Sequence, residues 1–168
     1  MPNRIHSEKS RKALYSPEER ARRDASIWTL VQGILAPVQF AVFVVSAILV
    51  IRFLTTGEGY GLTTASILLK TALLYAIMVT GAIWEKVVFG QYLFAPAFFW
   101  EDVFSFAVIA LHTLYLWGLV TGRIGAHPLM LLTLAAYAIY CVNALQFLLK
   151  LRAARLDAAA LRDEGATA

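Results

Sequence analysis

The sequence has little of what marks the common classes of soluble enzyme. Its single cysteine, Cys141, can form neither a disulfide nor a thiolate metal site within one chain, and we expect it to be a small packing residue inside an apolar run. There is no glycine-rich phosphate-binding loop, no HExxH motif and no CxxC motif among the 168 residues. These absences argue against nucleotide-binding, zinc-protease and thiol-redox chemistry.

Charged residues are scarce in the middle of the chain. Of 15 Lys and Arg, only four lie between residues 27 and 149: Arg52, Lys70, Lys86 and Arg123. The hydrophobic fraction of 60% exceeds that of ordinary soluble domains. Because the net charge of +4 belongs to the two ends, it indicates contact with an anionic membrane face and not with nucleic acid. The polar first 26 residues are not those of a cleavable signal peptide.

Apolar runs predict an all-α integral membrane protein with four transmembrane helices. These lie at residues 27–54, 62–84, 102–120 and 128–149. At 1.5 Å per residue, each is about long enough to cross a hydrocarbon core of roughly 30 Å. Before them, Ser16 as N-cap, Pro17 and Glu19 predict a short amphipathic N-terminal helix over 17–25 that lies on the membrane surface.

The charge pattern also predicts the division of the chain and its orientation. We expect a basic disordered tail at 1–15, a four-span membrane domain at 16–150 and a cytoplasmic helical tail at 151–168. Both ends are rich in Lys and Arg, whereas the loop at 55–61 has none and the loop at 121–127 has one. Positive charge favours the cytoplasmic side, so both termini are expected there.

A further apolar stretch, residues 85–101, separates the second span from the third. Between the pairs Glu85-Lys86 and Glu101-Asp102 lie fourteen residues, too few for a transmembrane helix. Their aromatic side chains are too apolar for an ordinary loop in water, so we expect an interfacial or re-entrant segment. Carboxylates beside an aromatic floor are costly at a membrane, which makes this stretch the candidate functional site.

One face of the third span connects this stretch with the interior. Glu101, Ser105, Val108 and His112 follow helical spacing, and Asp102 is turned away from them. If that face points inward, it lines a cavity with a carboxylate at the mouth and an imidazole near the midplane. Simpler interpretations stay open: the two acids can merely favour a helix N-terminus. His112 can form an interhelical hydrogen bond or ligate a metal centre.

Lys70 is the one cation placed well inside a predicted span. A central lysine costs about 2.5–3.5 kcal/mol on insertion scales, so it needs a partner or a route to water. A specific partner and a side chain that snorkels to the interface are both compatible with the sequence.

These residues carry a family resemblance. The run GAIWEKVVFGQYLFAPAFFWEDVFS at 81–105 closely resembles the 2-vinyl bacteriochlorophyllide hydratase family of phototrophic bacteria. The same holds for WTLVQGILAPVQF at 28–40, TGEGYGL at 56–62, SILLKTALLY at 66–75 and LKLRAARLDAA at 149–159. The resemblance covers residues 15–159 and contains no generic pattern, so it is specific.

The resemblance implies a hydro-lyase that adds water to the ring-A vinyl group of chlorophyllide a or bacteriochlorophyllide and forms a 1-hydroxyethyl group. It implies no protein cofactor, with magnesium present only in the substrate macrocycle. The implied partners are this substrate, the lipid bilayer and other pigment-biosynthesis enzymes, without nucleic acid. The implied location is a bacterial inner or intracytoplasmic membrane. The alternatives are a non-catalytic pigment-binding or assembly protein, or a small transporter.

Hydration of a vinyl group requires an acid, a base for the water and an apolar wall. A carboxylic acid in apolar surroundings keeps its proton more readily, so Glu101 and Glu85 are the candidates for acid and base, with Asp102 in reserve. Which carboxyl group moves which proton stays open.

The expected substrate-binding residues are polar groups near the site and the aromatic floor. His112, or the amide oxygen of Gln91 or Asn143, is expected to hold the substrate magnesium. Lys86 is expected to pair with a pigment carboxylate or with Glu85. The aromatic residues are Phe94, Phe98, Phe99 and Trp100.

Overall fold

The computed structural model describes residues 14–166 and contains, within that range, helices and no strand. Its helices are α1 (Pro17–Ala25), α2 (Ile27–Thr56), α3 (Tyr60–Phe89), α4 (Phe99–Thr121) and α5 (Ala126–Ala166). In α2, α3, α4 and the Ala126–Leu156 part of α5, length and composition suffice to cross a membrane. The chain is therefore a multi-pass membrane protein, as predicted. The proposed tail at 1–15 lies outside the described residues except for its last two.

Local sequence sets where the helices begin and end. Ser16 caps α1 in a reciprocal capping box with Glu19, as the sequence predicts, and Ser26 caps α2 through its hydroxyl. The α2 helix ends at Gly57 and the α3 helix at Gly90, both in the left-handed conformation that glycine adopts without strain. At the C-terminal side, α5 runs without a break into the tail expected at 151–168.

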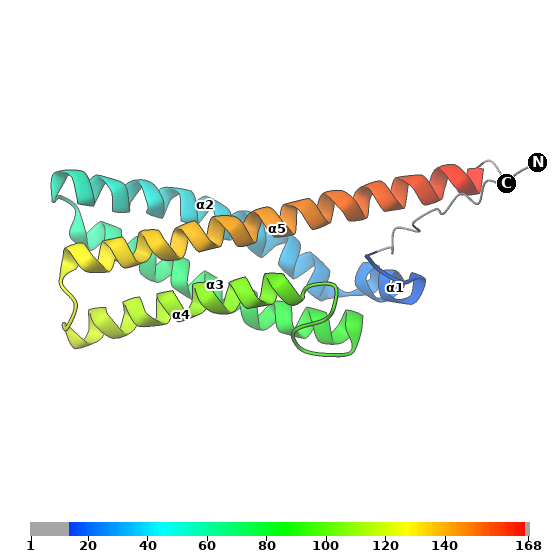
Figure 1. The fold of residues 1–168 in the computed structure, drawn as a ribbon, viewed down its shortest axis with the longest axis horizontal. Coiled ribbons are helices and arrows are strands. Elements are labelled where there is room, and N and C mark those ends of the chain that lie inside the picture. The colour runs from blue at the N-terminus through cyan, green and yellow to red at the C-terminus, as the bar shows by residue number, and fades with distance from the viewer. Residues whose placement is uncertain (1–13, 167–168) are drawn as a thin grey trace, which may run out of the picture.

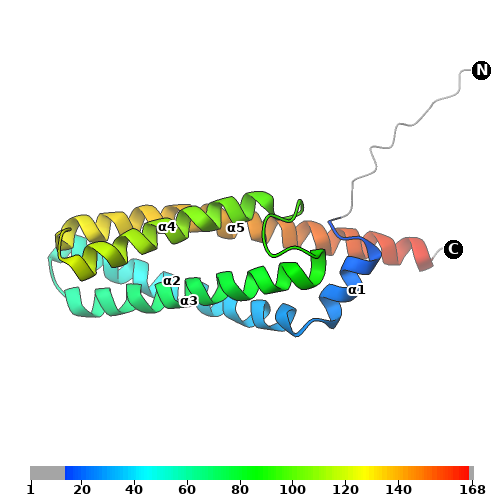
Figure 2. The ribbon, with the colours of Figure 1, turned by 90° about the horizontal axis from the view of Figure 1, so that it is seen from below.

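The membrane helices form two antiparallel hairpins. The helix α2 packs along α3, and α4 packs along α5, whereas α3 and α4 approach each other at few positions (Figures 1 and 2). Figure 1 shows that the loops at 57–59 and 122–125 lie at one end of the bundle. The segment 90–98, α1 and the extension of α5 lie at the other end.

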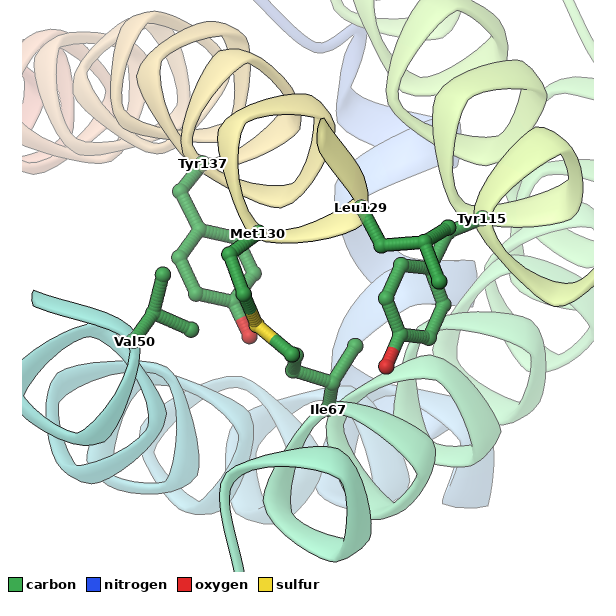
Figure 3. Packing of buried hydrophobic residues seen from close by; sticks show 6 residues of the cluster. All are labelled: Val50, Ile67, Tyr115, Leu129, Met130 and Tyr137. Carbon is green, nitrogen blue, oxygen red and sulfur yellow. The ribbon is translucent and has the colours of Figure 1, made fainter. Parts of the chain in front are cut away.

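The end with the two short loops is closed by apolar side chains from all four long helices. Figure 3 shows these side chains converging between the helices. The fully enclosed members are Val50, Ile67, Tyr115, Leu129, Met130 and Tyr137. A polar link crosses the edge of this core: the hydroxyl of Ser46 lies 2.8 Å from that of Ser66 and 2.6 Å from that of Tyr137. This link joins α2, α3 and α5.

The predicted break between the second and third spans is shorter than expected. The sequence analysis gave it residues 85–101, but α3 continues to Phe89 and α4 begins at Phe99, which leaves 90–98 outside the helices. Gly90 ends α3 at φ 84° and Pro96 precedes α4. Glu85 and Glu101 therefore project from helices. Helices hold side chains more rigidly than a loop would.

The expectation that Cys141 packs in the interior is wrong. Its side chain is exposed on the surface of α5 and is not a packing residue of the interior. The apolar run around it surrounds the whole helix, because a membrane helix faces lipid with apolar residues as well as the interior, so the run alone did not reveal the buried face.

Candidate functional site

Three carboxyl groups meet at the end of the bundle that carries the 90–98 segment. Glu85 comes from the last turns of α3, and Glu101 and Asp102 come from the first turn of α4. All three are buried, with at most 5% of each residue exposed. Glu85 lies against Asp102, and Glu101 is close enough to interact electrostatically with both. The structure therefore brings together the three acids that the sequence placed at the two rims of the aromatic stretch.

Two of these acids hold the backbone of the 90–98 segment. The N–H of Phe94 donates to Oδ2 of Asp102 at 2.6 Å, and the N–H of Ala95 donates to Oε2 of Glu85 at 3.1 Å. Phe94 has φ 59°, a conformation that bulky residues rarely adopt. Such strain persists only where the surroundings over-determine it, which the two carboxylates do here. Glu101 and Asp102 do lie in the first turn of α4, where the helix dipole favours acids, and Asp102 in addition holds the segment.

The third acid forms an ion pair with α5. Nζ of Lys150 lies 2.5 Å from Oε2 of Glu101, and it also donates to the carbonyl oxygen of Ala97. The Glu101 side chain is almost fully buried, and that of Lys150 is about one quarter exposed. Lys150 thus links α5, α4 and the 90–98 segment. This role is not evident from the sequence, where Lys150 is one of several basic residues at the start of the C-terminal tail.

The aromatic residues divide into an inner and an outer group. Phe98 is buried, packs edge-on to Trp84, stacks on Phe147 and lies beneath the Lys150 ammonium, whose Nζ is 4.7 Å from the ring centroid. The outer group lies on the surface of the bundle and begins with Phe94, which stacks on Phe106. Its other members are Phe99 and Trp100. One predicted floor is therefore two surfaces, separated by the backbone of the segment.

Residues before α2 close this end of the bundle. Tyr15 is buried, and its ring stacks on that of Phe89 with centroids 5.8 Å apart. Burial also raises the pKa of Tyr15, so its hydroxyl stays neutral. Nε and Nη2 of Arg22 donate to the carbonyl oxygen of Val88 at 2.9 and 2.6 Å, which satisfies one carbonyl that the end of α3 leaves open. The sequence analysis had placed Tyr15 in the tail.

Polar groups continue from the carboxyl groups into the interior. Nδ2 of Asn143 donates to the Ser105 hydroxyl at 2.8 Å, and its Oδ1 is buried without a partner in the described structure. Deeper in the bundle, Nδ1 of His112 lies 2.8 Å from the Val108 carbonyl oxygen, and its Nε2 is likewise buried and unpartnered. Because only a protonated Nδ1 can donate to that carbonyl, Nε2 carries a lone pair. The predicted inward face of α4 is confirmed.

Lys70 lies beside this deeper layer and does not snorkel. It is 0% exposed, and its Nζ has no hydrogen-bond partner among the described residues. The ammonium sits 3.7 Å from the centroid of the Tyr140 ring. A desolvated cation–π contact contributes about 2 kcal/mol, less than the cost of burying an ammonium ion.

Two predicted substrate contacts lie apart from the carboxyl groups. Lys86 is exposed, donates to the carbonyl oxygen of Gly90 at 2.7 Å and lies over Tyr92, and no ion pair with Glu85 occurs in the described structure. Gln91 is exposed in the segment and donates to the Leu93 carbonyl oxygen. Within the described part of the chain, no group of three or more His, Cys, Asp or Glu side chains is arranged to hold a metal ion.

Comparison with known proteins identifies the family of this chain. Residues 15–153 match the family model described as 2-vinyl bacteriochlorophyllide hydratase. The chain belongs to this family. The matched region begins at the buried Tyr15 and extends past Lys150, so it contains every contact described above for this end of the bundle.

Two curated relatives carry the same description. The 2-vinyl bacteriochlorophyllide hydratase of Rhodobacter capsulatus is 70% identical over 159 residues, which cover 95% of this chain and 92% of the relative. That of Cereibacter sphaeroides is 72% identical over 145 residues, which cover 86% of this chain and 89% of the relative. No solved structure matches the chain.

Proposed function

We propose that this protein adds water to the vinyl group of a chlorophyllide or bacteriochlorophyllide and forms a 1-hydroxyethyl group in bacteriochlorophyll biosynthesis. Family membership supports the reaction. The structural observation that carries the proposal is the meeting of three buried carboxyl groups, two in mutual contact and one paired with Lys150. This arrangement offers an acid and a base in one apolar site. We propose that Glu85, Glu101 and Asp102 are the catalytic groups.

Glu85 and Asp102 form the proposed acid. Two carboxyl groups in contact, with little water around them, are stable only when a proton lies between them. Glu85 then delivers that proton to the terminal carbon of the vinyl group. The π electrons form the new C–H bond and leave a cation on the carbon attached to the ring, where the conjugated macrocycle spreads the charge. The negative charge of Asp102 beside the new Glu85 carboxylate then favours the return of a proton to the pair.

Glu101 is the proposed base. Its side chain pairs with Lys150, and its carboxylate can accept a proton from the water that attacks the cation. The water oxygen bonds to the inner carbon, and one of its protons passes to Glu101. Transfer of that proton from Glu101 to the Glu85–Asp102 pair restores the starting state. The net change is the addition of one water molecule without any redox step, so we propose that no cofactor takes part.

The substrate must bring its ring edge to these groups from the membrane. The helices α3 and α4 approach each other at few positions outside the carboxyl groups. We propose that the macrocycle enters beside the 90–98 segment, with Phe98 as an inner wall and Phe94, Phe99 and Trp100 at the membrane side. The backbone N–H of Phe94 donates to Asp102, so a shift of the Phe94 ring would be coupled to a shift of this acid.

Two buried lone pairs are candidates for the axial ligand of the substrate magnesium. Amide oxygens suit this hard cation, and Oδ1 of Asn143 is fixed toward the interior because Nδ2 is bonded to Ser105. Ser105 is one helical turn, about 6 Å, from Glu101. Nε2 of His112 is the second candidate, about 16 Å from Glu101 along α4. Gln91 is less favoured, because it is exposed and bonded within the segment.

We also propose the orientation that the charge pattern predicts. The membrane domain at 16–150 would have both termini and the carboxyl groups on the cytoplasmic side of a bacterial inner or intracytoplasmic membrane, with the tail at 151–168 in the cytoplasm. Reporter fusions after residue 159 and in the 90–98 segment should report the cytoplasm, and fusions at Gly59 and Gly125 should report the opposite side. An opposite-side signal from the 90–98 segment would overturn this orientation.

The reaction is tested with purified protein in lipid nanodiscs and chlorophyllide a. We expect a more polar product whose mass is larger by one water, with the absorbance change of a lost conjugated vinyl group. In ¹⁸O-labelled water the new hydroxyl should carry the label. Pigment that co-purifies and stays chemically unchanged would instead support the alternative, a non-catalytic pigment-binding or assembly protein, which needs the aromatic walls but not the acids.

A further inference from the structure

Lys70 is a buried basic residue without an acidic partner among the described residues. It is 0% exposed, and its Nζ has no hydrogen-bond partner in the described structure. The ring of Tyr140 covers one side of the ammonium, and His112 lies close enough to interact with it. The thiol of Cys141 is also within electrostatic range, so the groups facing Lys70 are a phenol, an imidazole and a thiol, and none of them is a carboxylate.

Among the described residues, no acid forms an ion pair with this lysine. Glu85 lies fifteen residues further along α3, about 22 Å by the helical rise. Glu101 lies eleven residues, about 16 Å, from His112 along α4, and it already pairs with Lys150. A charge left inside a membrane protein without a partner is strongly unfavourable, and such residues generally face a substrate or ion. The missing anion is therefore expected on a ligand.

We propose that Lys70 binds the free carboxylate of the substrate's propionate arm, an inference that rests on the proposed function. A chlorophyllide is the pigment whose propionate arm is not esterified, so it supplies one carboxylate on an otherwise apolar molecule. With the vinyl group at the carboxyl cluster, the arm extends inward between the hairpins to Lys70. Along α3, Lys70 and Glu85 are about 22 Å apart by the helical rise, so the macrocycle, its extended arm and the two long side chains together span this separation.

Other lysines of the site are already engaged. Lys150 is paired with Glu101 and bonded to the Ala97 carbonyl oxygen. Lys86 is exposed and donates to Gly90, so water and that carbonyl already satisfy it. Lys70 is the buried lysine for which a ligand carboxylate would supply the first hydrogen-bond acceptor. A contact between Lys70 and the carboxylate would make the site selective. The free acid would bind, and the esterified pigment, which carries no anion, would bind more weakly.

The experiment measures binding of chlorophyllide a and of its methyl ester to the protein in nanodiscs of neutral lipid, by fluorescence quenching. Wild-type protein should bind the free acid at least about 30-fold more tightly than the ester, the scale of a buried charge pair that loses one partner. In Lys70→Met this preference should vanish, with binding of the ester unchanged. Lys70→Arg should keep most of the preference. The acid and the ester partition differently into lipid. This difference is the same for every variant, so it cancels when the acid-to-ester affinity ratio is compared between variants.

Lys86→Met is the matched control, since it removes the other lysine that could take the arm. It should keep the wild-type preference. Equal binding of acid and ester by wild-type protein, or a preference retained in Lys70→Met, overturns the proposal, and loss of the preference in Lys86→Met assigns the arm to Lys86 instead. The wild-type ratio requires no variant, so poor folding of Lys70→Met leaves the proposal testable.

Turnover of the vinyl group without acid–ester selectivity refutes this proposal alone, whereas selective binding without turnover refutes only the proposed reaction.

Discussion

At the end of the bundle that carries the loops at 57–59 and 122–125, the helices meet through enclosed apolar side chains such as Ile67 and Met130 (Figure 3). At the opposite end, the contacts between α3, α4, α5 and the 90–98 segment run through three buried acids and Lys150. The apolar end is closely packed and offers neither charged groups nor space for a ligand. A charged end costs more to assemble, but it provides groups that can move protons and a segment that can shift with them.

This contrast predicts that substitutions at the two ends affect different quantities. At the carboxyl end they should change turnover, with a loss of stability where an ion pair or hydrogen bond is removed, and at the apolar end they should change stability alone. Five predictions test this separation, from the largest expected effect to the smallest.

Glu85→Gln should have the largest effect. The amide nearly preserves shape but cannot deliver a proton to carbon, so turnover should fall about 10²–10⁴-fold. Chlorophyllide binding and membrane insertion should stay near wild type. The measurement is turnover and pigment binding on the same preparation, with Glu58→Gln, an exposed glutamate at the opposite end, as control. Wild-type turnover in Glu85→Gln would remove it as the acid and shift that role to Glu101 or Asp102.

Lys150→Met should lower both turnover and stability. It leaves Glu101 buried without its cation, and we expect about 2 kcal/mol of destabilisation, less than for a fully buried pair because Lys150 is partly exposed. Turnover should fall about tenfold or more, equivalent to roughly 1.4 kcal/mol in the barrier. Arg152→Met, an exposed neighbour, is the control.

The pairing itself is tested by a double-mutant cycle. Glu101→Gln combined with Lys150→Met should be less impaired than the sum of the two single changes, because the second change removes a group that the first has already left unpaired. Strict additivity would show that the two side chains act independently and would break the link between α5 and the acids.

Gly118→Ala should affect stability alone. A Cβ at this position would meet the Ile124 side chain at 2.6 and 2.9 Å, so the apolar end must shift, at a cost of about 1–3 kcal/mol. Turnover per folded protein should not change. Gly33→Ala is the matched control, because its Cβ would meet nothing within 4 Å. Adding Ile124→Ala should recover part of the loss, measured by thermal unfolding in detergent.

Arg22→Met should have the smallest effect. It removes the two hydrogen bonds to the Val88 carbonyl oxygen and should cost about 1 kcal/mol, since the site is only partly buried. Turnover should fall slightly, because Glu85 lies one turn before Val88. Arg20→Met, whose side chain makes no hydrogen bond or ion pair in the described structure, should behave as wild type. A loss in Arg22→Met as large as that in Glu85→Gln would contradict a supporting role.

Sequence alone determined the four spans, the capped helix at 17–25 and the inward face of α4, because long apolar runs, a capping box and helical spacing are local signals. It also singled out the three acids as a group, since they lie at the rims of one unusual stretch. The sequence also shows Lys70 within an apolar run, but it does not show which side chains surround it.

Only the tertiary structure decided which groups meet. The ion pair of Glu101 with Lys150 joins residues 49 positions apart, and the Arg22 bonds to Val88 join residues 66 apart. No local pattern encodes such distances. The division of the aromatic residues into an inner Phe98 and an outer group depends on the path of the 90–98 segment, which the two acids hold. In a membrane protein apolar side chains face both lipid and the interior, so composition cannot tell the two apart, and only the packing of the hairpins assigns each side chain to its surface.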